Sequence, residues 1–385
     1  MFKIIHKLDK TKLRIGEIKT KRGVIQTPFF MPDATRAVVK NTCSKELEKI
    51  GLEAMVVNTY HLCLQPGVDL IKKAGGVNKF MNFDKPLLAD SGGFQVFSLI
   101  HRLKEMGKIY DTHVEFKSPI DGSWHKLTPE KSIQIQFDLG VGMMVCLDDC
   151  PPNEFSREDL ENSVNRTIAW AKRCKKKYLR QIKKRKIKAE EAPLLFGVIQ
   201  GGAELDLRKK CALELIKIDF DGYGFGARPV DKDGNFLEKV LEFTADLIPK
   251  NKIRFALGIG TPEDIVKCAG LGWDMFDCVI PTREGRHGRL FQMSDVGCQI
   301  SDFNNNDKFY NTININNAKF ACDFRAINPD SELAELREYS LAYLHHLFKI
   351  KDPLGARLAS LNNLEFYNQL MRGIRLGGKK INKKL

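Results

Sequence analysis

The chain lacks any long hydrophobic run. No stretch of about 18 consecutive apolar residues occurs, so the sequence predicts no transmembrane helix. The first ten residues, MFKIIHKLDK, also lack the apolar segment of a secretory signal peptide. Disorder is not indicated, because 43% of the 385 residues are hydrophobic. We therefore expect a cytoplasmic globular protein with one large or two ordinary domains.

Paired cysteines are missing as well. The chain has ten cysteines, but no two of them form a CxxC pair. This argues against a cysteine-rich zinc module and against a disulfide framework. Most of the cysteines lie in apolar segments, which is typical of reduced, buried thiols.

Acidic residues are in the minority, with 48 Asp and Glu against 62 Lys and Arg and a net charge of +14. Such a charge indicates a polyanionic partner, most simply a nucleic acid, although solubility alone is an alternative explanation. The most basic segment, 172–188, is either a solvated helix face or a phosphate contact. Charge contributes affinity and steering but no sequence specificity.

No GxGxxG turn follows the first strand, which weakens a dinucleotide-binding interpretation, and no internal repeat is evident.

Short apolar runs predict buried strands at 54–60, 86–93, 142–149, 194–202, 220–227, 253–260 and 275–281. Segments with helical spacing lie between them, and the longest is 156–184. This alternation predicts an α/β fold and favours a closed (β/α)8 TIM barrel over an open doubly wound sheet.

The pattern changes after residue 291. The asparagine-rich segment 292–328 predicts a small β insertion, and 331–349 and 355–374 predict two helices. We expect a barrel catalytic core at 1–291. The β insertion and a C-terminal helical subdomain should occupy 292–375 and complete the fold, with a basic tail at 376–385.

Polar residues stand towards the ends of the predicted strands. They are Asn58, Asp90, Asp148, Gln200 and Asp277. In a barrel these ends converge on one mouth, where several acids push one another's pKa values apart. Two carboxylates that flank a glycosidic carbon can carry out a double displacement through a covalent sugar–enzyme intermediate. For each aspartate taken alone, a helix cap or loop ligand is the structural alternative.

One stretch, WDMFDCVIPTREGRHGRL at 273–290, combines two aspartates with a cluster of arginines. Asp274 and Asp277 lie on the apolar run, and Arg283 and Arg286 follow within a few residues. One interpretation is a structural ion pair. The other is an acid that reacts with a molecule held by the arginines.

Several motifs together resemble those of the bacterial tRNA-guanine transglycosylases. They are NTYHL (58–62), LADSGGFQVFS (88–98), LDDCPP (147–152), LLFGVIQGG (194–202), WDMFDCVIPTREGRHGRLF (273–291) and YSLAYLHHL (339–347). The likeness runs in order along nearly the whole chain. It implies a (β/α)8 barrel with a β insertion and a C-terminal helical subdomain. The implied activity replaces guanine at the wobble position of tRNAs with GUN anticodons by a 7-deazaguanine.

The resemblance also implies roles for single residues. Asp277 matches the nucleophile that attacks the wobble ribose, and Asp90 matches the general acid/base. Asp148 matches the carboxylate that accepts the N–H groups of the base. Gln200 and the backbone N–H at Gly226 match the donors to its carbonyl oxygen.

Further matches concern the surroundings of the base. Phe94 and Leu257 lie where the family sandwiches the base, and Asn58 and Ser91 match residues that support the acids. Arg283 and Arg286 match residues that read the flanking uridines. Such residues must bind a splayed single-stranded loop, because a stacked base cannot enter the pocket. Contact with backbone phosphates is the alternative for the arginines.

The sequence departs from the family at its structural zinc site. Where the family has three cysteines and a histidine, this chain has Ser331, Leu333, Leu336 and Asn362. Leucine cannot ligate a metal, and the adjacent His345 and His346 point to different faces of a helix. We therefore predict no cofactor and no zinc.

A second departure lies in GYGFGARPV (222–230), where Ala227, Arg228 and Pro229 replace glycine, leucine and alanine. The usual bacterial base, 7-aminomethyl-7-deazaguanine, is cationic, and an arginine that pointed into the pocket would repel it. Direct use of queuine is therefore the alternative substrate. If Arg228 points to solvent, this argument does not apply.

Two other functional classes remain as alternatives. One is a noncatalytic tRNA-binding paralogue, which the presence of both Asp90 and Asp277 argues against. The other is an unrelated barrel enzyme such as an aldolase or metal-dependent hydrolase, but no strand-end lysine and no HxH pair supports it. The resemblance also implies a homodimer that binds the tRNA anticodon stem-loop. Because the chain lacks a long apolar run, we expect no membrane partner.

Overall fold

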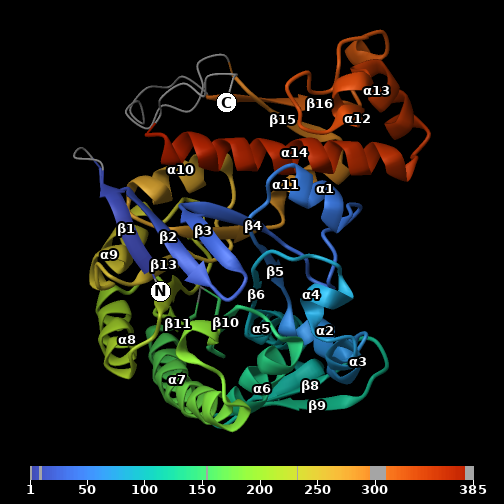
Figure 1. Cartoon of the computed structure of the whole chain (residues 1–385). Coiled ribbons are helices and arrows are strands. Elements are labelled where there is room, and N and C mark those ends of the chain that lie inside the picture. The colour runs from blue at the N-terminus through green and yellow to red at the C-terminus, as the bar shows by residue number, and fades with distance from the viewer. Residues whose placement is uncertain (1, 8–10, 153–154, 232, 295–308, 378–385) are drawn as a thin grey trace.

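The computed structural model describes residues 2–7, 11–152, 155–231, 233–294 and 309–377. An eight-stranded parallel sheet curls into a barrel surrounded by helices (Figure 1), which confirms the predicted fold class. In chain order the barrel strands are β4 (Phe29–Pro32), β5 (Met55–Val57), β6 (Leu87–Ala89), β10 (Met143–Val145), β11 (Leu194–Ile199), β12 (Gly222–Phe225), β13 (Ile253–Ala256) and β14 (Met275–Cys278). Asp33 forms a parallel bridge with Val56, which joins β4 to β5 and closes the barrel.

The seven strands predicted from apolar runs are all present, each shorter than its run. The eighth, β4, was not predicted, because its few apolar residues stand between Pro28 and Pro32 and show no periodicity. A three-stranded antiparallel sheet also precedes the barrel, formed by β1 (Phe2–Lys7), β2 (Arg14–Thr20) and β3 (Gly23–Thr27).

The barrel interior is filled with side chains. Phe29 and Met31 of β4 and Phe196 and Val198 of β11 alternate along their strands and belong to one buried cluster. Ile18 of the N-terminal sheet joins the same cluster. Inward-pointing residues that fill a small barrel leave no channel through it. A binding site must therefore lie at a mouth of the barrel.

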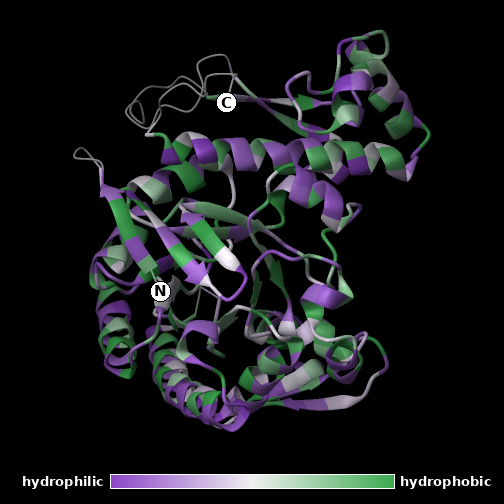
Figure 2. Cartoon of the chain, in the orientation of Figure 1, coloured by the Kyte–Doolittle hydropathy of each residue, from purple (hydrophilic) through white to green (hydrophobic). Residues whose placement is uncertain are grey.

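Helices cover the outside of the barrel. They are α1 (Ser44–Lys49), α2 (Thr59–Leu64), α3 (Val68–Lys73), α4 (Val77–Phe80), α5 (Gly93–Arg102), α6 (Pro129–Leu139), α7 (Arg157–Arg185), α8 (Leu205–Ile218), α9 (Glu238–Leu247) and α10 (Pro262–Gly270). In α7, Leu160, Val164 and Ile168 recur at four-residue spacing and are buried. Figure 2 shows α7 and α14 striped with hydrophilic and hydrophobic residues. In the described part of the chain, no helix combines the length and the apolar character that crossing a bilayer requires.

The chain after β14 forms α11 (Ile280–Arg286), a hairpin of β15 (Arg289–Met293) and β16 (Tyr310–Asn314), and the helices α12 (Ala334–Glu338), α13 (Leu341–Lys349) and α14 (Pro353–Arg375). The antiparallel hairpin confirms the predicted β insertion. Its residues 295–308 and the tail residues 378–385 lie outside the described part of the chain. A second insertion, not predicted, is the antiparallel sheet of β7 (Gly107–Ile109), β8 (Val114–Lys117) and β9 (Trp124–Leu127).

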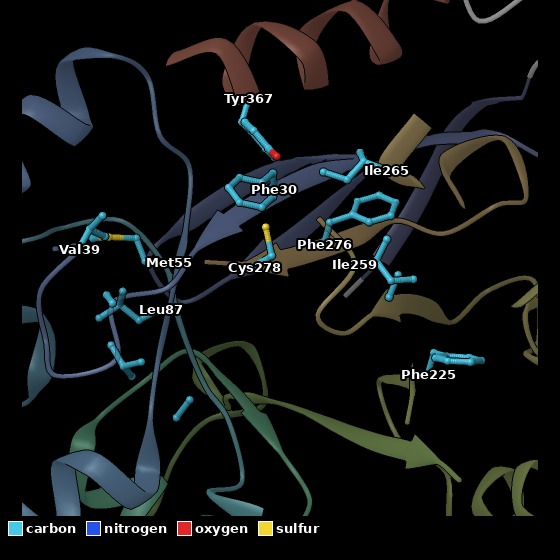
Figure 3. Packing of buried hydrophobic residues seen from close by; sticks show 14 of the residues in the cluster. Phe30, Val39, Met55, Leu87, Phe225, Ile259, Ile265, Phe276, Cys278 and Tyr367 are labelled. Carbon is cyan, nitrogen blue, oxygen red and sulfur yellow. The ribbon is translucent and has the colours of Figure 1, made fainter. Parts of the chain in front are cut away.

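Helix α14 packs directly on the barrel. Figure 3 shows Tyr367 of α14 pointing towards Phe30 of β4, and their ring centroids are 4.7 Å apart. The Tyr367 hydroxyl donates a hydrogen bond of 2.5 Å to the carbonyl of Gly260, after β13. The closing helix of the barrel is thus supplied by residues 353–375, and the hairpin with α12 and α13 is inserted before it (Figure 1).

Candidate active site

The predicted site residues gather at the carboxyl ends of the barrel strands. Asn58 follows β5, Asp90 follows β6, Gln200 follows β11 and Gly226 follows β12. Asp277 is the third residue of β14. In a parallel barrel these ends face one mouth, which is where such folds place their active sites.

Asp90 is held by a network of donors. Its Oδ1 accepts the backbone N–H groups of Thr59 at 2.9 Å and Gly92 at 3.1 Å, and its Oδ2 accepts the amide of Asn58 at 2.5 Å. Burial raises the pKa of Asp90 to about 7, the two N–H groups lower it, and the charge of Asp277 raises it. A pKa near neutrality suits a group that both donates and accepts a proton. Asn58 thus contacts Asp90, the acid that the sequence predicted it to support.

Asp277 has fewer contacts than Asp90. Its Oδ1 accepts the N–H of Gly258 at 2.9 Å, and no hydrogen bond from another described residue reaches Oδ2. Burial raises the pKa of Asp277 to about 7, and the N–H of Gly258 lowers it. One oxygen of this carboxylate is thus left for a bond to an incoming molecule, as a nucleophile requires.

A further acid, Asp33, was not predicted from the sequence. It directly follows β4, the strand that lies between β14 and β5 in the closed barrel. Its charge raises the pKa values of both Asp90 and Asp277, so it stands close to both. Burial raises the pKa of Asp33 itself, and the hydroxyl of Thr35, 2.6 Å away, lowers it. Because β4 was not recognised, no strand end marked this residue.

Asp148 and Gln200 form the inner wall of the mouth. The Gln200 amide nitrogen donates to Asp148 Oδ2 at 2.7 Å, and the Ser91 hydroxyl donates to Oδ1 at 3.4 Å. Burial raises the pKa of Asp148 to about 6, and the Gln200 amide lowers it. Gln200 is fully buried, yet its Oε1 has no partner among the described residues. A buried polar atom without a partner is costly, and a polar ligand would relieve that cost.

The N–H of Gly226 is engaged within the protein. It donates to the carbonyl of Ile199 at 2.9 Å, so it is not available to a base in this structure. The next N–H, that of Ala227, lies near the thiol of Cys150, at the same wall as Gln200. Burial raises the pKa of Cys150 to about 12, and the N–H of Ala227 lowers it. Among the described residues the N–H of Ala227 donates to no carbonyl, so Ala227 is a second candidate for the donor role predicted for Gly226.

Phe94 and Leu257 flank the mouth from two elements. Phe94 is the second residue of α5 and is 54% exposed, which is unusual for a large aromatic side chain. Leu257 directly follows β13, and its Cδ1 lies within 2.3 Å of the point that a Cβ on Gly224 would occupy. Glycine at 224 therefore leaves room for the Leu257 side chain beside β12. Whether the two side chains stack on a base remains a prediction.

Arg283 and Arg286 lie on α11, immediately after the strand that carries Asp277. Arg283 is exposed and its Nε is 3.4 Å from Glu284, whereas Arg286 is half-buried and donates to the Thr282 carbonyl at 3.1 Å. Residues three apart in a helix lie on one face, so both guanidinium groups are carried by the same side of α11.

Comparison with known proteins places this site in a family. A family model described as queuine tRNA-ribosyltransferase matches residues 9–379. Queuine tRNA-ribosyltransferases of Halothermothrix orenii and Caldanaerobacter subterraneus are each 41% identical over 374 residues, which cover 97% of this chain and 92% of theirs. That of Staphylococcus aureus is 41% identical over 362 residues, covering 94% of this chain and 88% of its own.

The chain belongs to the queuine tRNA-ribosyltransferase family. It is therefore an enzyme of the pentosyltransferase type within the glycosyltransferases, as predicted from the motifs. Three acids, Asp90, Asp148 and Asp277, lie at one mouth of the barrel. None of them forms a salt bridge with another residue that the structure describes. Paired structural acids are the usual alternative for buried carboxylates, and these three do not fit it.

The positions at which the resemblance implies a zinc site hold no suitable metal ligands in this chain. Ser331, Leu333, Leu336 and Asn362 are all buried, and they offer one hydroxyl and one amide but no thiolate or imidazole. The Asn362 amide donates to the Phe291 carbonyl at 3.0 Å. Within the described ranges no group of three His, Cys, Asp or Glu side chains could hold a metal ion. The residues present do not fit a zinc ion.

A carboxylate occupies this region instead. Glu365 of α14 is buried and accepts the Ser331 hydroxyl at 2.5 Å and the Glu332 N–H at 2.6 Å. Arg337 donates to the Ser331 carbonyl. The His345 ring nitrogen Nδ1 lies 2.6 Å from the Ile315 carbonyl and is therefore engaged elsewhere. These contacts tie the segment before α12 to α14 through side chains.

Proposed function

We propose that this enzyme exchanges guanine at the wobble position of tRNAs with GUN anticodons for a 7-deazaguanine through a covalent Asp277–ribose intermediate. The observation that carries the proposal is the gathering of Asp90, Asp148 and Asp277 at one mouth, buried or half-buried and without salt bridges among the described residues. The family membership supports the same reaction.

In the first step, the Oδ2 of Asp277 bonds to C1′ of the wobble ribose while the bond from C1′ to N9 of guanine breaks. Asp90 donates its proton to the departing base. The free oxygen of Asp277 supports its role as the nucleophile, and the pKa of Asp90 near 7 supports proton donation at neutral pH.

In the second step, Asp90 accepts the proton from N9 of the incoming 7-deazaguanine. N9 then bonds to C1′ and the ester bond to Asp277 breaks. Proton and charge balance across the two steps, so the enzyme returns to its starting state without a redox partner. One carboxyl that serves as acid and then as base is typical of retaining exchange at an anomeric carbon.

Base recognition follows from the polarity of the inner wall. Guanine and its 7-deaza analogues present two N–H groups beside one carbonyl oxygen. Asp148 offers acceptors for the first, and the amide nitrogen of Gln200 with the N–H of Ala227 offers donors for the second. Phe94 and Leu257 cover the faces of the ring, and stacking on an aromatic side chain contributes about 1–3 kcal/mol per base.

For the incoming base we propose 7-aminomethyl-7-deazaguanine. Arg228 is exposed, so its charge is screened by water and the repulsion argument for queuine loses its basis. Competition of 7-aminomethyl-7-deazaguanine and queuine against labelled guanine distinguishes the two. Stronger competition by queuine would reverse this assignment.

We further propose that the enzyme works without zinc and as a homodimer. The contacts of Glu365 supply a link that would otherwise need a metal. The exposed rings of Tyr339 and Tyr343, with centroids 5.0 Å apart, form an aromatic patch on the C-terminal subdomain that supports a contact with a second copy. Sedimentation analysis of the wild type and of Tyr343→Ala tests this. A wild type that sediments as a monomer at micromolar concentration contradicts the dimer.

The decisive experiment incubates the protein with an anticodon stem-loop RNA and follows uptake of labelled guanine. The wild type should incorporate the label and form a covalent RNA–protein adduct that survives denaturing electrophoresis. Asp277→Ala should do neither while still binding the RNA. Binding without exchange by the wild type would instead identify a noncatalytic tRNA-binding protein.

A further inference from the structure

Arg208 is a buried cation behind the base-binding wall. It lies in the first turn of α8 and is fully buried. Its guanidinium lies over the ring of Phe225, 3.9 Å from the centroid, and no carboxylate pairs with it in the described ranges. Burial lowers the pKa of Arg208 to about 9. Burying a charge without a counter-ion is unfavourable. A buried arginine of this kind therefore indicates a role that an uncharged side chain in its place could not fill.

Backbone carbonyls take the place of the counter-ion. Arg208 donates from Nε to Gly202 at 2.7 Å, from Nη1 to Ile199 at 3.2 Å and from Nη2 to Gly226 at 2.9 Å. These three carbonyls belong to the last residue of β11 and to the loops after β11 and β12. The planar guanidinium fixes the directions of all three bonds at once, which a lysine ammonium cannot do.

Two of these carbonyls determine where the neighbouring N–H groups point. In a trans peptide the C=O of one residue and the N–H of the next lie in one plane and point in opposite directions. Holding the Gly226 carbonyl towards Arg208 therefore turns the N–H of Ala227 away from Arg208, towards Cys150 and the base wall. Holding the Ile199 carbonyl likewise fixes the backbone from which Gln200 projects.

The backbone at Ala227 needs such support. Its φ is 99°, in a region that residues other than glycine rarely adopt. A non-glycine residue held there is strained and persists only where its surroundings enforce it. The bond from Arg208 to the preceding carbonyl provides that constraint.

We propose that Arg208 is a positioning residue that aims the Gln200 amide and the Ala227 N–H at the carbonyl oxygen of the bound base. The proposal rests on the proposed function, because it assigns Arg208 a part in the base specificity of that same site. Arg208 does not touch the base. It determines how strongly the enzyme distinguishes a base by its carbonyl group.

The test compares guanine with 6-thioguanine as competitors of labelled guanine in the exchange reaction. 6-Thioguanine keeps N1–H and the 2-amino group but replaces the carbonyl oxygen by sulfur, a weaker acceptor. The ratio of the two inhibition constants measures recognition of the oxygen. It does not depend on the fraction of active protein, since both competitors meet the same sample.

In Arg208→Lys we expect the preference for guanine over 6-thioguanine to fall by about tenfold, the effect of losing one well-directed hydrogen bond. Arg254→Lys is the matched control. Arg254 is also buried and donates to two carbonyls, those of Ile248 and Gly272, but it lies near the start of β13, away from the mouth. Its replacement should lower the melting temperature and leave the ratio unchanged.

Each outcome has a distinct meaning. A wild-type ratio retained by Arg208→Lys overturns the proposal, because Arg208 then only stabilises the fold. If that variant does not fold, Phe225→Leu keeps the arginine and removes the ring that fixes its plane, and an unchanged ratio there overturns the proposal equally. Failure of the wild type to exchange labelled guanine at all would refute the proposed function instead.

Discussion

Asp274 directly precedes β14 and Asp277 is the third residue of that strand, and among the described residues only Asp274 of the two is paired with a cation. Asp274 is fully buried and accepts Arg14 Nε at 3.0 Å, with a second bond from Arg14 Nη2. Asp277 lies at the carboxyl end, where no described cation pairs with it. The structural interpretation of the motif therefore holds for one of its two aspartates. Its first aspartate forms a structural ion pair, and its second is left with a free oxygen.

Replacement of Asp277 should separate activity from stability. In Asp277→Asn we expect the exchange rate to fall by at least about a thousandfold, because the nucleophile is lost. The same change should raise the free energy of unfolding at pH 8 by about 1–3 kcal/mol, because a carboxylate with its pKa raised to about 7 is no longer forced to ionise in the fold. Denaturant titration and labelled-guanine exchange measure the two effects.

The sign of the stability effect depends on pH. The folded-state pKa of Asp277 lies above its unfolded value near 3.9, so ionisation opposes folding fully above about pH 7 and not at all below about pH 4. The gain in Asp277→Asn should shrink accordingly as the pH falls. Asp274→Asn is the control, and it should lower the free energy of unfolding by about 3–5 kcal/mol because Arg14 stays buried without its partner. Equal effects of the two variants would contradict this contrast.

Asp33 should set the pH at which the enzyme loses activity in acid. Its charge raises the pKa values of Asp90 and Asp277, so Asp33→Asn should lower both and move the acidic limb of the pH profile of kcat/KM to lower pH. The two acids titrate together, so the shift belongs to the pair. Profiles from about pH 5 to about pH 9 for the wild type and the variant measure it.

The control for Asp33 is Asp264 of α10, another partly buried aspartate whose pKa burial raises. It does not appear among the charges that shift either catalytic acid. Asp264→Asn should therefore leave the acidic limb in place. If the acidic limb of the pH profile stays in place in Asp33→Asn, the role of Asp33 is confined to its local hydrogen bond with Thr35.

The sequence predicted the site residues that lie at the ends of recognisable apolar strands. Asp90, Asp148, Gln200 and Asp277 each end or follow a run long enough to indicate a strand, and recognition of the motifs then supplied roles for them. Asp33 was missed because β4 has only four residues, one of them Pro32. Arg208 was missed because it stands among charged residues in LDLRKK, where helical spacing predicts a solvated side chain. Its partners are carbonyls of two distant loops, and no local pattern reports such contacts.

The C-terminal subdomain should be stable without metal. A strong chelator should leave the melting temperature of the wild type unchanged, and elemental analysis should find less than stoichiometric zinc. Glu365→Ala should lower the free energy of unfolding by about 1–3 kcal/mol, because the Ser331 hydroxyl and the Glu332 N–H lose their acceptor. One zinc ion per chain, or melting lowered by the chelator, would contradict the metal-free proposal.

The arginines of α11 should determine which nucleotides flank the exchanged base. If Arg283 reads a flanking base, Arg283→Ala should lower kcat/KM for the natural stem-loop by about tenfold and should affect a loop with a substituted flanking uridine much less. Exchange assays with both RNAs measure this difference. The alternative, a phosphate contact, predicts an equal loss for both RNAs together with a weaker salt dependence of binding.

Lys176, an exposed residue of the basic helix α7, serves as the comparison for Arg283. If α7 touches the RNA at all, Lys176→Ala should weaken binding of both stem-loops alike and reduce the slope of affinity against salt, because a lysine on a phosphate neutralises charge without reading a base. Arg283 stands six residues after Asp277 on the helix that directly follows β14, whereas Lys176 belongs to the outer helical ring. The opposite result would be a loss of selectivity between the two stem-loops in Lys176→Ala but not in Arg283→Ala. It would show that α7, and not α11, recognises the flanking bases.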